Sequence, residues 1–264
     1  MDPSIVNDIS TDFTSTIHRE PYPAISPIKP SLSQAGKTVL ITGGGTGIGK
    51  AIAHNFILAS AATVIIIGRR VAKLQEAAAE LEAAGKQSGK TVSVITKGCD
   101  ITSDLQVEAL WADLADSGVH VDVLVLNAAV QPLAQTLFEL GTAAVWSFFE
   151  AHVKGPLYFA ELFYKQHNSS DGPKQKFLIN VSSAAIHFRG NPIVDMRPAY
   201  SLTKSSGTLA IQMLADRIPA EDMQILNFHP GMVYGAVFEA DGIPEDALPF
   251  DDGKFVYYTG TGES

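Results

Sequence analysis

The chain has 264 residues, 46% of them hydrophobic and 18% charged, which is the composition of a globular protein with a buried core. Its formal net charge of −9 argues against broad binding to nucleic acid or to anionic membranes. Cys99 is the only cysteine, so an intrachain disulfide is excluded; a small buried side chain is expected there rather than a nucleophile.

Residues 1–34 predict an extended arm, because they contain five prolines and no sustained hydrophobic periodicity. The segment has neither a signal-peptide core nor the basic character of a transit peptide. Apolar runs such as Ala59–Gly68 are too short to span a bilayer. We therefore expect a cytoplasmic protein without membrane contact, in which residues 35–264 form a single domain.

From Lys37 onward, short runs rich in β-branched residues alternate with helical stretches. The expected strands are Thr38–Thr42, Thr63–Ile67, Thr91–Thr96, Val121–Leu126, Lys176–Val181 and Met223–Phe228. Helical stripes are expected through Val71, Leu74, Ala78 and Leu81, and through Val107, Leu110 and Leu114. Strands that are apolar on both faces, separated by helices, predict an α/β fold with a doubly wound, mostly parallel sheet covered on both sides.

The first strand leads into a glycine-rich turn, Thr42-Gly-Gly-Gly-Thr-Gly-Ile-Gly49. Gly43 permits a tight turn, Gly47 lets the backbone approach a phosphate, and Gly49 lets the following helix pack on the strand. Backbone N–H groups at such a helix start can bind a pyrophosphate, so the turn predicts a dinucleotide site.

The end of the second strand bears on the choice of cofactor. An NAD site is expected to place Asp or Glu there, against the ribose hydroxyls. This chain has Gly68-Arg69-Arg70, and a guanidinium can pair with a 2′-phosphate. NADP(H) is therefore favoured; the alternative is an arginine at a helix start that only faces solvent.

Several motifs together resemble the short-chain dehydrogenase/reductase family. They are Thr42–Gly49, Asp100, Asn127-Ala128-Ala129, Ser183, Tyr200-x-x-x-Lys204 and Pro230-Gly231, in that order. The resemblance covers about Lys37 to Val233 and implies a Rossmann-type sheet in a single-domain enzyme that interconverts alcohols and carbonyls with NAD(P). The arm around Pro21–Ile25 is also similar to fungal members.

The resemblance implies a catalytic set of Ser183, Tyr200 and Lys204. Tyr200 would be the acid/base toward the substrate oxygen; a free tyrosine titrates near pH 10, and the ammonium of Lys204 one turn on would lower that pKa. Lys204 would also hold the nicotinamide ribose. Ser183 would hydrogen-bond the substrate oxygen, with Ser182 as the competing choice.

The resemblance also implies a set of cofactor-binding residues and no metal ligand. Asp100 and Ile101 would flank the adenine, Asn127 and Ala128 would form the floor, and Pro230, Gly231 and Val233 would meet the nicotinamide end. The full cofactor set is Gly43, Thr46, Gly47, Ile48, Gly49, Arg69, Asp100, Ile101, Asn127, Ala128, Tyr200, Lys204, Pro230, Gly231 and Val233.

Three segments depart from the family pattern. His152 stands where the family usually has an asparagine of its proton relay; it could carry protons itself or only pack a helix. The segment His187–Arg197 is longer than usual and is expected either beside the substrate or in solvent. After Gly231, the acidic and proline-broken stretch Ala236–Phe250 predicts an abbreviated C-terminal helix and strand, with an open pocket and the sixth strand at the sheet edge; the alternative is a short strand at Lys254–Tyr258, without a full helix before it.

The leading hypothesis is an NADP(H)-dependent oxidoreductase that interconverts an alcohol and a ketone or aldehyde on a small organic molecule. The alternative is a catalytically weak or inactive NADP-binding protein with a truncated substrate site. No nucleic-acid partner is expected. The family pairs long helices that here span about 142–167 and 199–217, so a homodimer or homotetramer is expected, with the abbreviated last strand arguing against the tetramer.

Overall fold

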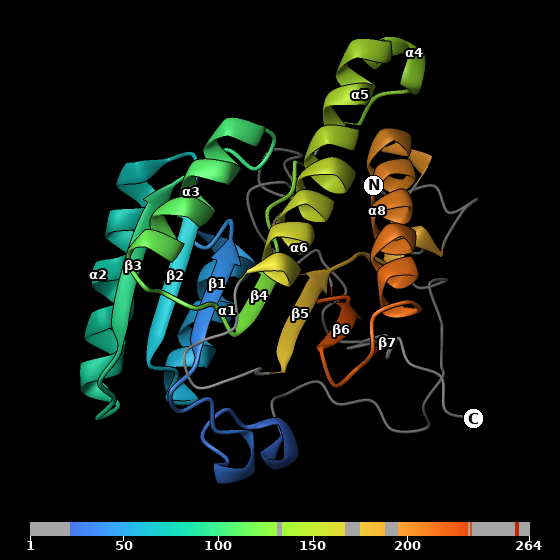
Figure 1. The fold of residues 1–264 in the computed structure, drawn as a ribbon. Coiled ribbons are helices and arrows are strands. Elements are labelled where there is room, and N and C mark those ends of the chain that lie inside the picture. The colour runs from blue at the N-terminus through green and yellow to red at the C-terminus, as the bar shows by residue number, and fades with distance from the viewer. Residues whose placement is uncertain are drawn as a thin grey trace.

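The computed structural model describes residues 22–130, 134–166, 175–187, 195–231, 233 and 257–258 (Figure 1). Within these ranges the chain forms a seven-stranded sheet in the order β3-β2-β1-β4-β5-β6-β7. The first six strands are parallel: β1 (Thr38–Thr42), β2 (Thr63–Gly68), β3 (Ser93–Gly98), β4 (Val123–Leu126), β5 (Lys176–Val181) and β6 (Met223–Phe228). β7 (Tyr257–Tyr258) runs antiparallel to β6.

Helices cover both faces of this sheet (Figure 1). The α-helices are α1 (Gly47–Leu58), α2 (Val71–Gln87), α3 (Asp104–Asp116), α4 (Leu137–Leu140), α5 (Thr142–Phe149), α6 (Gly155–Lys165) and α8 (Pro198–Ala215). The π-helical turn η4 (Glu150–Lys154) joins α5 to α6, and the 3₁₀ turns are η2 (Pro23–Ile25), η3 (Pro30–Leu32) and η5 (Ala184–Ile186). The predicted doubly wound α/β class is confirmed.

The strands build two separate cores because successive side chains of a strand point to opposite faces. On β1, Leu40 faces a core with α3, α6 and α8, whereas Val39 and Ile41 face a core with α1 and α2. Both cores are sealed from water, and Leu40, Ile41, Ile65 and Ile66 are fully buried. This two-sided burial explains why the strands are apolar at almost every position.

The strands begin and end within two residues of the predicted positions, and the helical stripe on α2 is displaced. Its buried residues are Leu74, Ala77, Leu81 and Gly85, spaced by three, four and four. Val71, expected in the stripe, is 50% exposed at the first position of the helix, and Ala78 is only half-buried. The predicted spacing placed the stripe slightly to one side of the face that packs on β2 and β3.

The described residues that flank the six parallel strands make short contacts with the rest of the fold. The N–H of Gln34 donates to the Ala59 carbonyl at 2.7 Å, and Ala35 forms an isolated bridge with Ala61. The rest of the predicted arm up to residue 21 lies outside the described residues, as does the stretch 234–256. β6 was expected at the sheet edge; instead Phe228 pairs with Tyr257. Within the described ranges, no helix is long and apolar enough to cross a bilayer.

The strand order reverses direction between β1 and β4, which are neighbours although two strands separate them in sequence. Their following helices leave toward opposite faces, so a crevice opens beyond the carboxyl ends of these strands. The candidate site lies at that crevice.

The buried core predicts a large stability difference between two leucines. Leu124 on β4 is fully buried, whereas Leu105 on α3 is 79% exposed. Leu124→Ala should lower the free energy of unfolding by about 2–5 kcal/mol because it leaves a cavity in the sheet. Leu105→Ala should change it by less than about 0.5 kcal/mol. Urea unfolding followed by circular dichroism measures both; equal effects would contradict the central position of β4.

Candidate functional site

The glycine-rich turn after β1 forms an open cradle at the start of α1. Gly43 has φ +68°, a conformation that other residues rarely adopt. A Cβ on Gly49 would lie 2.3 Å from the Gly43 carbonyl oxygen, so only glycine lets α1 approach the turn this closely. Thr46 occupies the N-cap of α1 but its side chain does not cap the helix. The first N–H groups of α1 are therefore available to an anion.

A pocket of about 450 Å³ lies beside this turn, at the carboxyl ends of β1 to β4. Its lining includes most residues predicted to bind cofactor: Gly43, Thr46, Gly47, Ile48, Gly49, Arg69, Asp100, Ile101, Asn127, Ala128 and Val233. Four others predicted for the nicotinamide end do not line it: Tyr200, Lys204, Pro230 and Gly231. The structure thus brings the predicted adenosine and phosphate residues together in one cavity, and the remaining four lie at α8 and beyond β6.

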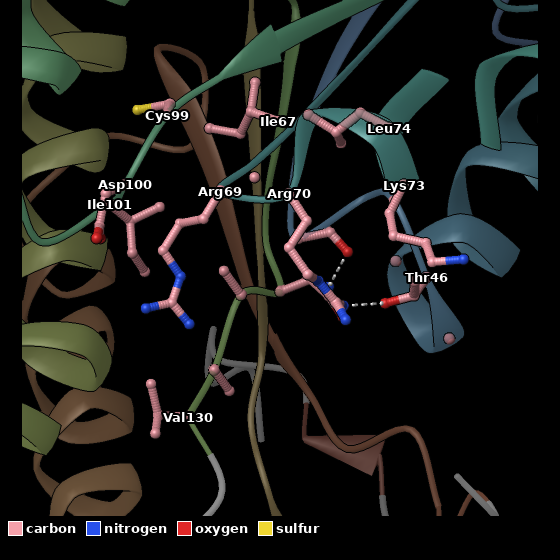
Figure 2. A pocket seen from close by; sticks show the side chains of 18 of the residues that line it. Thr46, Ile67, Arg69, Arg70, Lys73, Leu74, Cys99, Asp100, Ile101 and Val130 are labelled. Carbon is pink, nitrogen blue, oxygen red and sulfur yellow. Dashed lines mark hydrogen bonds between the residues drawn. The ribbon is translucent and has the colours of Figure 1, made fainter. Parts of the chain in front are cut away.

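Cationic side chains gather at the β2 end of the pocket. Figure 2 shows Arg69 extending into the cavity toward Ile101 and Val130, while Arg70 lies against Thr46. Nη2 of Arg70 donates to Thr46 Oγ1 at 3.3 Å. Lys73, one turn into α2, also lines the pocket and pairs with Glu76 at 2.6 Å. The sequence reasoning missed Arg70 and Lys73 as pocket residues, although their adjacency to Arg69 and one-turn spacing were visible signals.

Asp100 is the one carboxylate among the described residues that line the pocket. Its Oδ1 accepts from the N–H of Thr102 at 3.0 Å and from the Thr102 hydroxyl at 2.8 Å. The carboxylate is thereby held within its own turn, which fixes the pocket wall after β3. The neighbouring Cys99 is buried, and burial followed by the charge of Asp100 raises its pKa to about 11. It is therefore a thiol at neutral pH, as expected of a packing residue.

A buried hydroxyl joins the ends of β1 and β4. Thr42 Oγ1 donates to the Val125 carbonyl at 3.3 Å and accepts from the N–H groups of Asn127 and Ala128, both at 2.9 Å. The side-chain amide of Asn127 returns the contact by donating to the carbonyls of Thr42 at 2.9 Å and Gly43 at 3.3 Å. Asn127 therefore holds the glycine turn in place, a role that its position at the end of a strand does not reveal.

Lys204 projects from α8 toward the end of β5. Its side chain is 9% exposed, and Nζ donates to the Val181 carbonyl at 2.6 Å. Burial lowers the pKa of Lys204 to about 8, so the group remains mostly an ammonium at neutral pH. Tyr200 lies half-buried one turn earlier on the same helix. The predicted helical pair thus sits where α8 crosses the carboxyl end of the sheet.

The two candidate serines have different hydrogen-bond partners. Ser182 is buried, and its hydroxyl is hydrogen-bonded to Thr208 of α8 at 2.6 Å. Ser183 is half-buried, and its Oγ accepts from the N–H of Ala185 at 3.2 Å as the N-cap of η5. Its hydroxyl proton is not committed by that contact, which leaves it for a substrate oxygen. The geometry favours Ser183 over Ser182 for the predicted role.

Two imidazoles lie near the Lys204 charge. Burial, followed by Lys204, lowers the pKa of His152 to about 3. Burial, then Lys204 and His187, lowers the pKa of His229 to about 4. Both rings are consequently neutral at physiological pH, so Lys204 carries the local positive charge. In the longer segment His187–Arg197, residues 188–194 lie outside the described part of the chain, and its expected position beside substrate stays a prediction.

The matching family model is the short chain dehydrogenase model, which aligns with residues 37–243. The chain is 30% identical over 221 residues to "Short chain dehydrogenase/reductase AacuD" of Aspergillus aculeatus, an alignment that covers 84% of this chain and 72% of that protein. The protein therefore belongs to the short chain dehydrogenase family, whose members are oxidoreductases that use a nicotinamide cofactor.

Solved structures of short-chain dehydrogenases and oxidoreductases share this fold. A short-chain type dehydrogenase/reductase from Mycobacterium marinum superposes with a TM-score of 0.70 at 21% identity, over 80% of this chain and 78% of that one. A metagenomic short-chain oxidoreductase in complex with NADP superposes with a TM-score of 0.64 at 25% identity, over 76% of this chain and 83% of that one.

The Thr42 hydroxyl generates a stability prediction. Thr42→Val should lower the free energy of unfolding by about 1–3 kcal/mol, because the N–H groups of Asn127 and Ala128 lose their acceptor. Thr42→Ser keeps the hydroxyl and should be the milder change. Urea unfolding measures the free energy of unfolding of both variants. Amide hydrogen exchange at Asn127 and Ala128 should accelerate only in the valine variant. Equal effects of both variants would show that the methyl group matters more than the hydroxyl.

Proposed function

We propose that this protein is an NADP(H)-dependent oxidoreductase that interconverts an alcohol and a ketone or aldehyde on a small organic molecule. The observation that carries the cofactor preference is the group of Arg69, Arg70 and Lys73 at the end of β2, where the pocket presents cations. A cofactor in this pocket would lie with its pyrophosphate at the start of α1 and its adenosine ribose beside Arg69.

The preference must come from side chains, since the fold accommodates a dinucleotide with or without the extra phosphate. A 2′-phosphate adds about 1.5 to 2 negative charges, which a guanidinium can bind through paired hydrogen bonds. Asp100, the carboxylate in the turn after the neighbouring strand β3, is engaged by Thr102. The complex of the metagenomic relative with NADP is consistent with this choice.

The residues at α8 supply the proton chemistry in this proposal. A bound nicotinamide cofactor would supply or accept the hydride. Tyr200 gives its phenolic proton to the substrate oxygen during reduction and takes it back during oxidation. The buried ammonium of Lys204 stabilises the phenolate between these events, and Ser183 donates a hydrogen bond to the same substrate oxygen.

The remaining parts of the proposal concern location and assembly. We propose a cytoplasmic protein that acts on a small molecule, as a homodimer or homotetramer built on α5, α6 and α8. Large apolar side chains are exposed on these helices at Trp146, Leu209 and Met213, as expected of a surface that a second copy covers.

Arg69→Asp tests the cofactor preference. The variant removes the guanidinium and adds a carboxylate that repels a 2′-phosphate, so NADPH affinity should fall about 10- to 100-fold while NADH affinity is kept or improved. Fluorescence titration of the reduced cofactors measures both dissociation constants. Arg217→Asp makes the same charge change at an exposed position after α8 and should leave both constants unchanged. Equal affinity of the native chain for NADPH and NADH would contradict the proposal.

Tyr200→Phe tests the proton transfer. The variant lacks only the phenolic oxygen, so NADPH should still bind while kcat falls about 10²- to 10⁴-fold. A panel of ketones and alcohols, assayed by the absorbance of reduced nicotinamide, identifies the substrate for this comparison. Tyr164→Phe removes a hydroxyl from the outer surface of α6 and should have no effect. Undiminished turnover in Tyr200→Phe would rule out the assigned role, and cofactor binding without any native turnover would favour the inactive NADP-binding alternative.

A further inference from the structure

We propose that His152 is a positioning residue: a neutral imidazole, protonated on Nδ1, that fastens the catalytic turn of α8 to the segment after β4 and so sets where the Tyr200 phenol lies. This inference rests on the proposed role of Tyr200. In this role the His152 side chain connects the pocket wall to the proton donor, and it does not transfer protons itself.

The hydrogen bonds of the ring define its protonation state. His152 is 4% exposed. The N–H of Val130 donates to Nε2 at 3.0 Å, so Nε2 must hold a lone pair. The ring proton of the neutral form therefore lies on Nδ1, which is 2.8 Å from Thr203 Oγ1. That hydroxyl in turn donates to the Ala199 carbonyl at 2.7 Å, which completes a chain with one donor and one acceptor at each step.

These hydrogen bonds join the elements that the proposed reaction needs. Val130 lines the pocket just after β4. Thr203 lies between Tyr200 and Lys204 on α8, so a bond to its hydroxyl holds the turn that carries both. The His152 ring also meets the Tyr200 ring edge-on, with centroids 5.6 Å apart and planes at 88°. Such edge contacts prefer a defined geometry, and this one limits where the phenol can turn.

The backbone around His152 is built for close approach to α8. His152 lies in the π-helical turn η4, a local widening that is frequent at functional sites. A Cβ on Gly207, one turn beyond Thr203, would lie 2.2 Å from the His152 carbonyl oxygen. Backbone contact at Gly207 and the side-chain bond at Thr203 together hold η4 against one face of α8, so a shift of η4 is transmitted to Tyr200.

The same contacts oppose protonation of the ring. A second proton on Nε2 would face the N–H of Val130, donor against donor, and would remove that hydrogen bond. The charge would also be buried near the ammonium of Lys204, and burial and this charge hold the pKa of His152 at about 3. A ring that stays neutral throughout the working pH range cannot alternate between proton acceptor and donor.

Two substitutions of His152 separate positioning from proton transfer. His152→Gln supplies an amide that can accept from Val130 and donate to Thr203 but cannot titrate, whereas His152→Leu can make neither bond. We expect His152→Leu to lower kcat about 10²-fold through misplacement of the phenol, with a smaller effect on the dissociation constant of NADPH. His152→Gln should restore most of kcat and keep the native pH profile. Equal loss in both variants, or a changed pH profile in the glutamine variant alone, would overturn the proposal.

Thr203 provides an independent test should His152→Leu fail to fold. Thr203→Val removes the hydroxyl that His152 contacts and should lower kcat, whereas Thr203→Ser keeps it and should remain close to native. Ser206→Ala is the matched control, because Ser206 donates to the Leu202 carbonyl at 2.9 Å on the exposed side of the same helix. Native kcat in Thr203→Val would contradict the inference.

A readout that needs no substrate distinguishes failure of the inference from failure of the proposed function. The nitrogen-15 resonances of the seven histidines can be recorded without substrate, and the His152 resonance is assigned by its loss in His152→Gln. The His152 resonance should show Nδ1–H and no titration between about pH 5 and 9. Exchange of the Val130 amide should be slow in native protein and fast in His152→Leu. A titrating His152 or an unprotected Val130 overturns the inference, whereas normal turnover in Tyr200→Phe overturns only the function on which it rests.

Discussion

The ammonium of Lys204 is the constraint on which the candidate active centre depends. A charge that is 9% exposed must be stabilised by neighbouring dipoles, and the Val181 carbonyl at the end of β5 supplies one at 2.6 Å. The charge lowers the pKa of His152 and His229, so the imidazoles around it stay neutral. With both imidazoles neutral, Lys204 is the charged member of these three groups, and in the proposed mechanism its ammonium would stabilise the Tyr200 phenolate.

The sheet makes that arrangement possible because the carboxyl ends of its six parallel strands lie along one side of the sheet. The ends of β1 and β4 position Thr42 and Asn127, whose hydrogen bonds fix the glycine turn, while β5 ends at Val181, whose carbonyl accepts from Lys204 of α8. The phosphate cradle and the proton-transfer residues are therefore parts of one rigid edge. The hydrogen bond from the Val130 N–H to His152 Nε2 is one contact that connects the pocket wall to the segment packed on α8.

Sequence patterns predicted the strands well because their apolar, β-branched runs reflect burial on both faces, a property local to each segment. The glycine turn was also predictable from the sequence, because the local backbone at Gly43 and Gly49 leaves no room for a larger residue. Contacts between segments far apart in the sequence could not be predicted from it. The partners of His152, Val130 and Thr203, lie 22 and 51 residues away, and Thr42 meets Asn127 at a separation of 85. No local pattern encodes those distances, so the roles of these residues required the fold.

Charge is distributed unevenly over the molecule, and this bears on how a dinucleotide would arrive. The chain carries a formal net charge of −9, yet Arg69, Arg70 and Lys73 share one rim of the pocket. At physiological salt the Debye length is about 8 Å, so a phosphate at this rim would interact mainly with nearby charges, which include Arg69, Arg70 and Lys73. A long polyanion would also meet the net negative charge of the molecule along its length. In the proposed function, a compact dinucleotide would place its phosphates at the start of α1 and beside Arg69 and would avoid much of this repulsion, so the charge pattern that disfavours nucleic acid is compatible with a small phosphorylated cofactor.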